Sequence, residues 1–316
     1  MISGSPHISV IIAAYNAQSS IERCLHSIFS QTIDGLDIIV IDDGSTDDTP
    51  VIVAELIKSD ERTRFIRQTN AGVSAVREKG LMLAKGEYVI YVDADDWLEP
   101  DALSLMYNAA KAHSSDMLIC DFWVHDSRGA VYDSQKPEQP ATAENVFAQL
   151  LGKLHGSVCN KLIRREAFIN NDVHFPPGVN WGEDLYVCLL LLSKGISVHH
   201  IPQALYHYDQ TQNDQSLTSN WYEYPMPERM RVLRMIEPIV QDSNQGAFST
   251  YVGNIAYDAL FCKKEYCKDF NAVFGAYRET IAHSGIPRWK RTLIRLRYMG
   301  IRLPLRSLRI LKHAFT

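Results

Sequence analysis

Short apolar segments alternate with amphipathic ones over the first 120 residues, and this rhythm constrains the fold more than any other feature. β-branched, apolar segments predict strands at residues 8–12, 37–41, 64–67, 88–92 and 117–121. Apolar residues spaced at three and four positions predict a helix at residues 21–29, and we expect further helices between the strands at residues 49–58, 73–84 and 100–113. Strands that alternate with helices build a mostly parallel sheet covered on both faces, so we expect an α/β fold.

The rhythm changes after residue 121. Shorter segments predict strands at residues 131–132, 174–175, 198–201 and 204–208, and helices at residues 143–154 and 185–194. From residue 226 onward the pattern is helical. We therefore expect an α/β domain of residues 1–220 and a helical, basic C-terminal region of residues 221–316.

The charge of the chain is divided unevenly along its length. Residues 1–225 contain 16 Lys and Arg against 30 Asp and Glu, a net −14, whereas residues 226–316 contain 16 against 7, a net +9. Residues 288–312 hold nine Lys and Arg and no acid, with apolar residues interleaved. This pattern predicts a basic amphipathic helix on an anionic membrane surface or, equally, a helical cap docked on the acidic domain. Nucleic acid is not expected as a partner, because no stacking aromatics accompany the charge.

The apolar segments are too short to cross a bilayer, which takes about 18 or more apolar residues. The six cysteines show no C-x-x-C spacing, which disfavours a zinc site and fits reduced thiols. We therefore expect a cytoplasmic protein, peripheral at the inner face of the cell membrane.

Polar side chains gather where three of the predicted strands end. The first strand ends at Tyr15, the second runs into Asp42 and Asp43, and the fourth runs into the acidic segment 93–96. In an open α/β sheet, ligands bind outside the carboxyl ends of the strands. One rim of the sheet should therefore carry several carboxylates and an aromatic ring, which either stacks on a base or packs on the first helix.

The segment 93–96 suits a divalent cation. Crowded carboxylates repel each other, and their pKa values rise unless a cation lies between them. Residues i and i+2 of an extended segment point the same way, so Asp93 and Asp95 can face one ligand, with Ala94 and Asp96 facing elsewhere. Mn²⁺ or Mg²⁺ takes one or two carboxylates and completes its shell with phosphates and water. Alone, the segment is also compatible with a solvated acidic turn before a helix.

Two other nucleotide-binding patterns do not occur in the sequence. There is no G-x-x-x-x-G-K-[ST], so the P-loop class is excluded. There is no G-x-G-x-x-G after the first strand either, which excludes the dinucleotide-binding class.

Four segments follow one another in a specific order and spacing within the first hundred residues. They are ISVIIAAYN at 8–16, VIDDGSTD at 40–47, NAGVSAVR at 70–77 and GEYVIYVDADD at 86–96. Together they resemble glycosyltransferase family 2, the inverting enzymes of the GT-A fold. The resemblance covers about residues 7–215. It implies a GT-A type sheet, Rossmann-like and mostly parallel with helices on both faces, followed here by the C-terminal helical extension.

The resemblance also implies roles for matching positions in the first half of the site. Ala13, Tyr15 and Asp43 would hold the nucleobase, with Asp43 accepting a hydrogen bond from its imide N–H. Asn70 and Arg77 would lie beside the base and the ribose, although Arg77 alone is also compatible with a helix-surface charge.

The acidic segment completes the donor site that the resemblance implies. Asp93 would touch the ribose, and Asp95, with Asp93 beside it, would bind the Mn²⁺ or Mg²⁺ that bridges the diphosphate. Asn16 and Ala94 belong to the same expected donor-binding set.

A second acidic pair lies further along, in the segment 181–185. Its sequence, WGEDL, resembles the E-D motif of the family. An inverting transfer is a single displacement, so the acceptor hydroxyl must lose its proton to a positioned base. We expect Asp184 to be this base and Glu183 to support it. The pair would also suit a helix N-terminus on electrostatic grounds alone.

Two further segments resemble parts of the family's site. The segment 160–164 resembles one that lines the acceptor side, where Lys161 is either a ligand or a surface charge. Tyr206-His207-Tyr208 with Ser216 resembles a loop that closes over the diphosphate. Relatives commonly carry an Arg after the aromatic pair, whereas this chain has Asp209-Gln210. His207 is a third candidate metal ligand or a structural histidine.

These observations predict an inverting hexosyltransferase. It would move a sugar from a UDP-sugar to a hydroxyl of a glycan or lipid-linked acceptor during surface polysaccharide synthesis. A sugar nucleotidyltransferase is an alternative with a similar sheet, but residues 13–16 do not resemble its Gly-rich loop. A non-catalytic, membrane-associated scaffold is another, although it should have lost Asp184 or the metal ligands.

Overall fold

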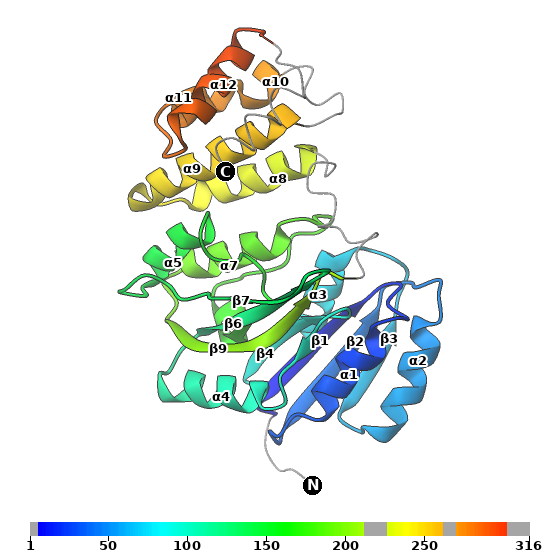
Figure 1. Ribbon diagram of the computed structural model, residues 1–316. Helices are drawn as coiled ribbons and strands as arrows, with labels where there is room; N and C mark the ends of the chain where they lie inside the picture. Colours follow the sequence, from blue (N-terminus) through cyan, green and yellow to red (C-terminus); the bar gives the residue numbers. More distant parts are fainter. Residues whose placement is uncertain (1–5, 212–225, 262–269, 302–316) are drawn as a thin grey trace. The chain divides into compact units, whose positions relative to one another are not determined.

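The computed structural model describes residues 6–211, 226–261 and 270–301 (Figure 1). The chain divides into two compact units, one of residues 1–150 and 154–213 and one of residues 151–153 and 214–316. The domain boundary expected between residues 220 and 221 falls outside the described residues and stays a prediction.

The described strands of the first unit form one nine-stranded mixed sheet in the order β3-β2-β1-β4-β8-β6-β9-β5, with β7 paired to β6. The strands are β1 (Ile8–Ala14), β2 (Leu36–Asp42), β3 (Thr63–Arg67), β4 (Tyr88–Asp93), β5 (Trp97–Leu98), β6 (Met117–Asp126), β7 (Gly129–Asp133), β8 (Lys161–Arg164) and β9 (Val198–Asp209). The helices of this unit are α1 (Ile21–Phe29), α2 (Thr49–Leu56), α3 (Val73–Leu83), α4 (Ala102–Ala112), α5 (Ala143–Leu150), α6 (Arg165–Asn170) and α7 (Glu183–Ser193). The expected α/β class is confirmed.

The strand order reverses at β1. Strand β1 pairs in parallel with β2 on one side and with β4 on the other. Because β-α-β crossovers are right-handed, α1 and α2 cover one face of the sheet and α3 the other. The edge between β1 and β4 is therefore the topological switch point, where open α/β sheets bind ligands.

Burial on both faces explains the apolar strands at this switch point. Strand β2 is buried along its whole length, and β1 and β4 are buried except for one residue each. Helix α1 adds a buried stripe spaced as expected, formed by Ile21, Cys24, Leu25 and Ile28. A sheet covered in this way reads as near-continuous apolar runs, which is why the pattern was visible in the sequence.

The second half of the sheet differs from expectation in several places. Strand β8 runs antiparallel to β4 and β6 and was not predicted, and neither were β5 and α6. The strands expected at residues 198–201 and 204–208 are one strand, β9, and residues 174–175 are not a strand. These differences arise because the segments concerned are only two to six residues long, which is too short to show the periodicity of a strand or a helix.

The described helices of the second unit are α8 (Met226–Ile236), α9 (Gln245–Asp258), α10 (Phe270–Phe274), α11 (Arg278–Ala282) and α12 (Arg288–Tyr298). Helix α12 carries the first part of the basic segment. It buries Leu293 and Ile294 and exposes Arg288 and Arg295. The rest of that segment, residues 302–312, lies outside the described residues. Among the described helices, none is long and apolar enough to span a membrane.

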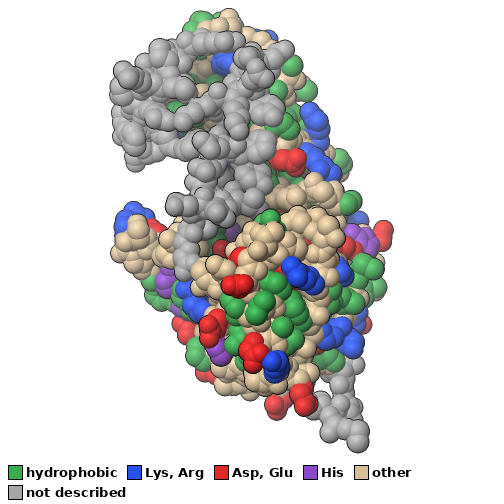
Figure 2. All heavy atoms as spheres, turned by 90° about the vertical axis from the view of Figure 1, so that its right-hand side faces the viewer, with side chains coloured by type: hydrophobic (Ala, Val, Ile, Leu, Met, Phe, Trp, Pro, Cys, Tyr) green, Lys and Arg blue, Asp and Glu red, His purple; other side chains and the backbone are tan. Residues whose placement is uncertain are grey.

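Charged side chains of both signs are interspersed on the face drawn in Figure 2. Hydrophobic side chains appear there in small groups between them. The net acidity expected for the first 225 residues therefore does not form a single-sign patch on the visible part of this face.

Gly86, just before β4, lies directly against the backbone of β1. A Cβ at this position would stand 2.3 Å from the nitrogen of Ser9 and 2.6 Å from the carbonyl carbon of Ile8. The backbone N–H of Gly86 also donates to Ser9 Oγ at 2.8 Å. We predict that Gly86→Ala lowers the free energy of unfolding by about 1–3 kcal/mol, the cost of overpacking. Urea denaturation measures it, with Gly152→Ala as control because nothing lies within 4 Å there. Equal stability of the two variants would contradict the prediction.

Candidate active site

The carboxyl ends of β1, β2 and β4 meet at the switch point. Ala13 in β1 is in register with Ile41 in β2 and with Asp93 in β4. Its neighbour Ala14 is in register with Asp42. The tertiary structure thus brings together the strand ends that the sequence singled out.

Asp43 organises the loop that leads into α3. Its carboxylate accepts hydrogen bonds from Gln68 Nε2 at 2.8 Å, from the backbone N–H of Ala71 at 2.9 Å and from that of Gly72 at 2.8 Å. Three donors fix the carboxylate, which is buried. The same loop carries Asn70, which is exposed.

Tyr15 and Asn16 form the loop after β1. The side chain of Tyr15 is 52% exposed, so the ring is available to a ligand rather than packed in the core. Asn16 takes a left-handed conformation with φ of 50°. Its backbone N–H donates to Ser45 Oγ, and its Oδ1 accepts from the backbone N–H of Thr46, both at 2.9 Å. Asn16 therefore fixes the loop that presents Tyr15.

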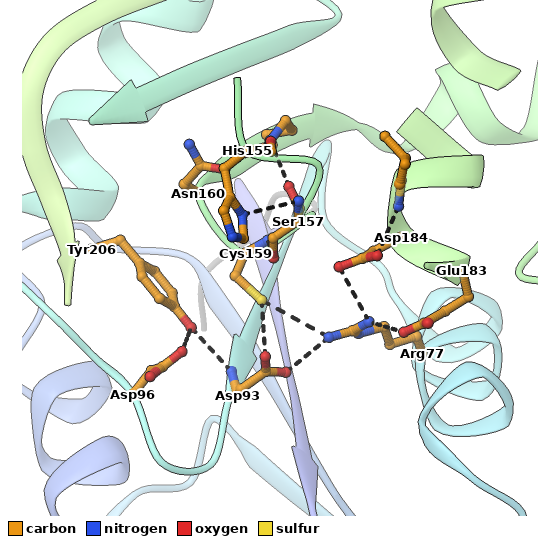
Figure 3. Close-up of polar contacts among 12 residues, drawn as sticks. Arg77, Asp93, Asp96, His155, Ser157, Cys159, Asn160, Glu183, Asp184 and Tyr206 are labelled. Atoms are coloured by element: carbon orange, nitrogen blue, oxygen red, sulfur yellow. Dashed lines mark hydrogen bonds and ion pairs between the residues drawn. The ribbon is translucent and has the colours of Figure 1, made fainter. Parts of the chain in front are cut away.

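Arg77, buried in α3, is the centre of the site (Figure 3). Its NH2 donates to Asp93 Oδ1 at 3.0 Å, and its NH1 makes a close ion pair with Glu183. The same NH1 lies 4.0 Å from Asp184 Oδ2. One guanidinium therefore joins the end of β4 to the first turn of α7, and the surface alternative for Arg77 is excluded.

The two acids of the E-D pair have different surroundings. Glu183 is buried against Arg77, and burial followed by the charge of Asp184 raises its pKa to about 8, against the opposing effect of Arg77. Asp184 keeps 22% of its side chain exposed, and its Oδ1 accepts from the backbone N–H of Leu185 at 2.8 Å. Of the two carboxylates, Asp184 is the one that a substrate can reach.

The acidic turn after β4 splits into carboxylates with separate partners. Asp96 is buried and accepts hydrogen bonds from the hydroxyl of Tyr206 and, at 2.8 Å, from the backbone N–H of Asp209. The carboxylate of Asp95 accepts no hydrogen bond from another residue in the described part of the chain. Burial raises the pKa of Asp95 to about 6, and the charge of Asp93 adds to the shift.

These residues fit a divalent cation. No group of three potential ligands occurs within the described ranges. Mg²⁺ or Mn²⁺ needs only one or two protein carboxylates when phosphates and waters supply the rest. A carboxylate with a raised pKa, beside a second one, is stabilised by a positive charge. Asp95, with Asp93 next to it, is thus suited to the metal, and Ala94 between them is buried.

The structure does not bring His207 to these carboxylates. Its Nε2 lies 3.0 Å from Glu99 Oε1, and its Nδ1 lies 2.9 Å from His125 Nε2. The ring also stacks on Trp97. Both nitrogens are engaged, which favours the structural alternative. Residues 206–208 lie within β9 rather than in a loop, and Ser216 falls outside the described residues.

Lys161 is buried, so the surface-charge alternative is wrong. Its Nζ donates to the carbonyl oxygens of His155 at 2.9 Å and Ser157 at 2.5 Å, and to Asn160 Oδ1 at 2.8 Å. All three donors of the ammonium group are used within the protein. Lys161 therefore shapes the segment before β8 rather than offering a free cation to a ligand.

Sequence reasoning missed two residues that contact the site. The thiol of Cys159 donates to Asp93 Oδ2 at 3.3 Å. The NH2 of Arg23 donates to the carbonyl oxygen of Asp95 and to Asp209 Oδ2, both at 2.6 Å. Cys159 gives no signal in the sequence, and Arg23 resembles any helix-surface charge. The contact between Arg23 and Asp209, where relatives commonly carry an Arg, could only be seen in three dimensions.

The raised pKa of Asp95 has a consequence for stability. Between its ordinary value of 3.8 and about 6, the folded protein holds a proton that the unfolded chain releases. Without metal, the free energy of unfolding therefore falls as pH rises through this range, on the order of 3 kcal/mol. We predict that Asp95→Asn is more stable than wild type in EDTA at pH 7.5, and that the difference disappears near pH 4.

Thermal unfolding across this pH range measures the effect, with the exposed Asp48→Asn as control. Mn²⁺ should raise the melting temperature of wild type and not that of Asp95→Asn. A stability difference that does not vary with pH would contradict the assignment.

Comparisons with known proteins point to one family. The family model described as glycosyl transferase family 2 matches residues 9–171, just over half of the chain. EpsH of Bacillus subtilis, a protein named as a glycosyltransferase, is 34% identical over 210 residues, which are 65% of this chain and 61% of EpsH. The chain thus spans about three fifths of that relative. A chondroitin synthase of Escherichia coli is 43% identical over 100 residues, 32% of this chain and 15% of the synthase.

Solved structures share the fold. Staphylococcus aureus TarS in complex with UDP superposes with a TM-score of 0.73 at 19% identity, covering 98% of this chain and 92% of that one. The TarS complex with UDP-GlcNAc gives 0.72 at 20% identity, covering 96% and 90%. The expected GT-A type fold is confirmed. The matched family model, the four sequence segments and the shared fold lead to one conclusion: this chain belongs to glycosyl transferase family 2.

Proposed function

We propose that the protein is an inverting glycosyltransferase that moves a sugar from a UDP-sugar to a hydroxyl of a glycan or lipid-linked acceptor. Surface polysaccharide synthesis is the proposed process. One observation carries the proposal: Arg77 holds a donor-side carboxylate, Asp93, and the partly exposed carboxylate of Asp184 within reach of one guanidinium. The proposed donor-binding carboxylate and the proposed general base therefore lie close to each other.

The choice of UDP rests on the nucleotide side of the site. The ring of Tyr15 is exposed, and the carboxylate of Asp43 is held at the adjacent strand end. A carboxylate accepts from the imide N–H of uracil, and an aromatic ring stacks on its face. The TarS complexes with UDP and UDP-GlcNAc support the same donor class.

A divalent metal, Mn²⁺ or Mg²⁺, would be held by Asp95 with Asp93 beside it. When bound, it would stabilise the charge of the departing diphosphate. The chain's own contribution is to keep the Asp95 carboxylate free. Arg23 holds its backbone carbonyl, and Asp96 is turned away toward Tyr206.

Asp184 would take the proton from the acceptor hydroxyl as that oxygen attacks the anomeric carbon. Its partial exposure and its place in the first turn of α7 support this role. Glu183 would support the base by fixing Arg77 from the other side. The proton moves to Asp184 while the bond from the anomeric carbon to the diphosphate breaks.

The basic segment 288–312 is proposed to contact an anionic membrane surface with its exposed residues only. Helix α12 already buries Leu293 and Ile294 within its own unit. In the described part of the segment, residues 288–301, the exposed basic side and Met299 and Ile301, which are 64% and 46% exposed, would face the bilayer.

The donor assignment predicts metal-dependent nucleotide binding. We expect wild type to bind UDP with micromolar affinity in Mn²⁺ and far more weakly in EDTA, because a metal held by Asp95 would neutralise charge on the diphosphate. Asp95→Ala should bind UDP weakly in both buffers. Titration calorimetry measures this, with Asp48→Ala as control. A folded wild type that binds no UDP would exclude the UDP-sugar donor.

The base assignment predicts a separation of binding from turnover. We expect Asp184→Asn to reduce sugar transfer about 10²–10⁴-fold, the usual contribution of a general base. Its affinity for UDP should stay within about twofold of wild type, because the substitution leaves the donor side intact. Release of UDP from a UDP-sugar in the presence of acceptor measures turnover. Full activity of Asp184→Asn would refute the assignment.

A further inference from the structure

A loop of residues 155–159 reaches both ends of the site (Figure 3). At one end, the thiol of Cys159 donates to Asp93 Oδ2 at 3.3 Å. At the other end, burial and the charge of Lys161 lower the pKa of His155, and the charge of Asp184 opposes that shift. The loop therefore contacts the end of β4 through Cys159, and His155 is within range of the charge on the first turn of α7.

The ammonium group of Lys161 fixes the loop by hydrogen bonds to its backbone. Two of its three donors go to loop carbonyls, those of His155 and Ser157. The third goes to Asn160, whose Nδ2 in turn donates to the carbonyl oxygen of Cys120 in β6 at 2.7 Å. A buried, fully bonded ammonium group is costly to arrange, and here its contacts serve to fix the loop.

The ring of His155 is oriented by several contacts at once. Its backbone N–H donates to Gln135 Oε1 at 2.7 Å, and its Nδ1 lies 3.3 Å from the backbone N–H of Ser157. Because Nδ1 accepts, the proton of the neutral ring is on Nε2. Desolvation and the charge of Lys161 lower the pKa of His155, which keeps the ring neutral at pH 7.

The second ring nitrogen of His155, Nε2, is available for a further hydrogen bond. Nε2 of His155 has no hydrogen-bond partner among the residues that the structure describes. The residue as a whole is solvent-accessible, although its ring lies against Phe122 and Tyr208, which accounts for the desolvation. The loop thus presents one oriented N–H donor.

The geometry of the reaction indicates where the sugar ring of the donor should lie. In a single displacement, the anomeric carbon is between the leaving diphosphate and the attacking oxygen, so the sugar ring spans the distance from the metal side to the base. One guanidinium, that of Arg77, bridges Asp93 and Asp184. Residues 155–159 contact the first of these carboxylates through Cys159, and the charge of the second opposes the lowered pKa of His155. The sugar ring would therefore lie over them.

We propose that residues 155–159 select the donor sugar, with His155 Nε2–H donating to a ring hydroxyl or an N-acetyl oxygen and Lys161 acting as a positioning residue. The inference rests on the proposed UDP-sugar function and names the part of the chain that distinguishes one sugar from another. An oriented donor discriminates well, because a sugar without the matching acceptor leaves it unpaired.

The test compares the affinities of UDP, UDP-glucose, UDP-galactose, UDP-GlcNAc and UDP-GalNAc by titration calorimetry in Mn²⁺. Wild type should prefer one of the four sugars. His155→Ala should weaken that preferred donor about 5–10-fold, the value of one neutral hydrogen bond, and leave UDP within about twofold. His155→Gln keeps an N–H donor and should retain part of the preference. The exposed His26→Ala serves as a matched control.

Three results would overturn the inference. The first is a wild type that binds all four UDP-sugars and UDP equally. The second is an unchanged ranking in His155→Ala. The third is a loss in His155→Ala that is the same for UDP as for the sugars, which would indicate general damage to the site. If wild type bound no UDP, the proposed function would fail and this inference with it.

Discussion

A buried guanidinium holds the site together. Arg77 comes from α3 and bonds to Asp93 at the end of β4 and to Glu183 in α7, residues 16 and 106 positions away in the chain. Removing a charge from water is costly unless partners satisfy it, so these contacts form as a set or not at all. The nucleotide-side sheet and the base-bearing helix are therefore joined by one side chain, and the site is complete only when both are folded.

Strand β9 supports the acidic turn with only one of two successive side chains, because neighbouring residues of a strand face opposite sides. Tyr206 points to Asp96 and to the backbone of Asp93, whereas its neighbour His207 points to Glu99 and His125 on the other face. Successive side chains of a strand face opposite ways, so one of the two aromatic residues reaches the site and the other cannot. The motif alone does not tell which, and this is why His207 was a candidate ligand.

Much of the first half could be predicted from the sequence. The buried parallel strands have continuous apolar runs, and helix α1 has clear periodicity, so both were visible without a structure. Strand β8 was missed because it is four residues long and carries a lysine. A charged residue argues against burial unless its partners are known, and the partners of Lys161 are loop carbonyls that any residue possesses.

The sequence by itself determined the family, the order of the strand ends and the carboxylates that reach the rim. These are local properties, written in runs, spacings and motifs of neighbouring residues. Only the tertiary structure decided which acid is exposed and which is paired, that Asp184 is accessible while Glu183 is held by Arg77, and that Arg23 approaches Asp209. The reason is physical: burial and pairing depend on residues far away in the chain, and a contact across 100 or more residues leaves no pattern in either segment.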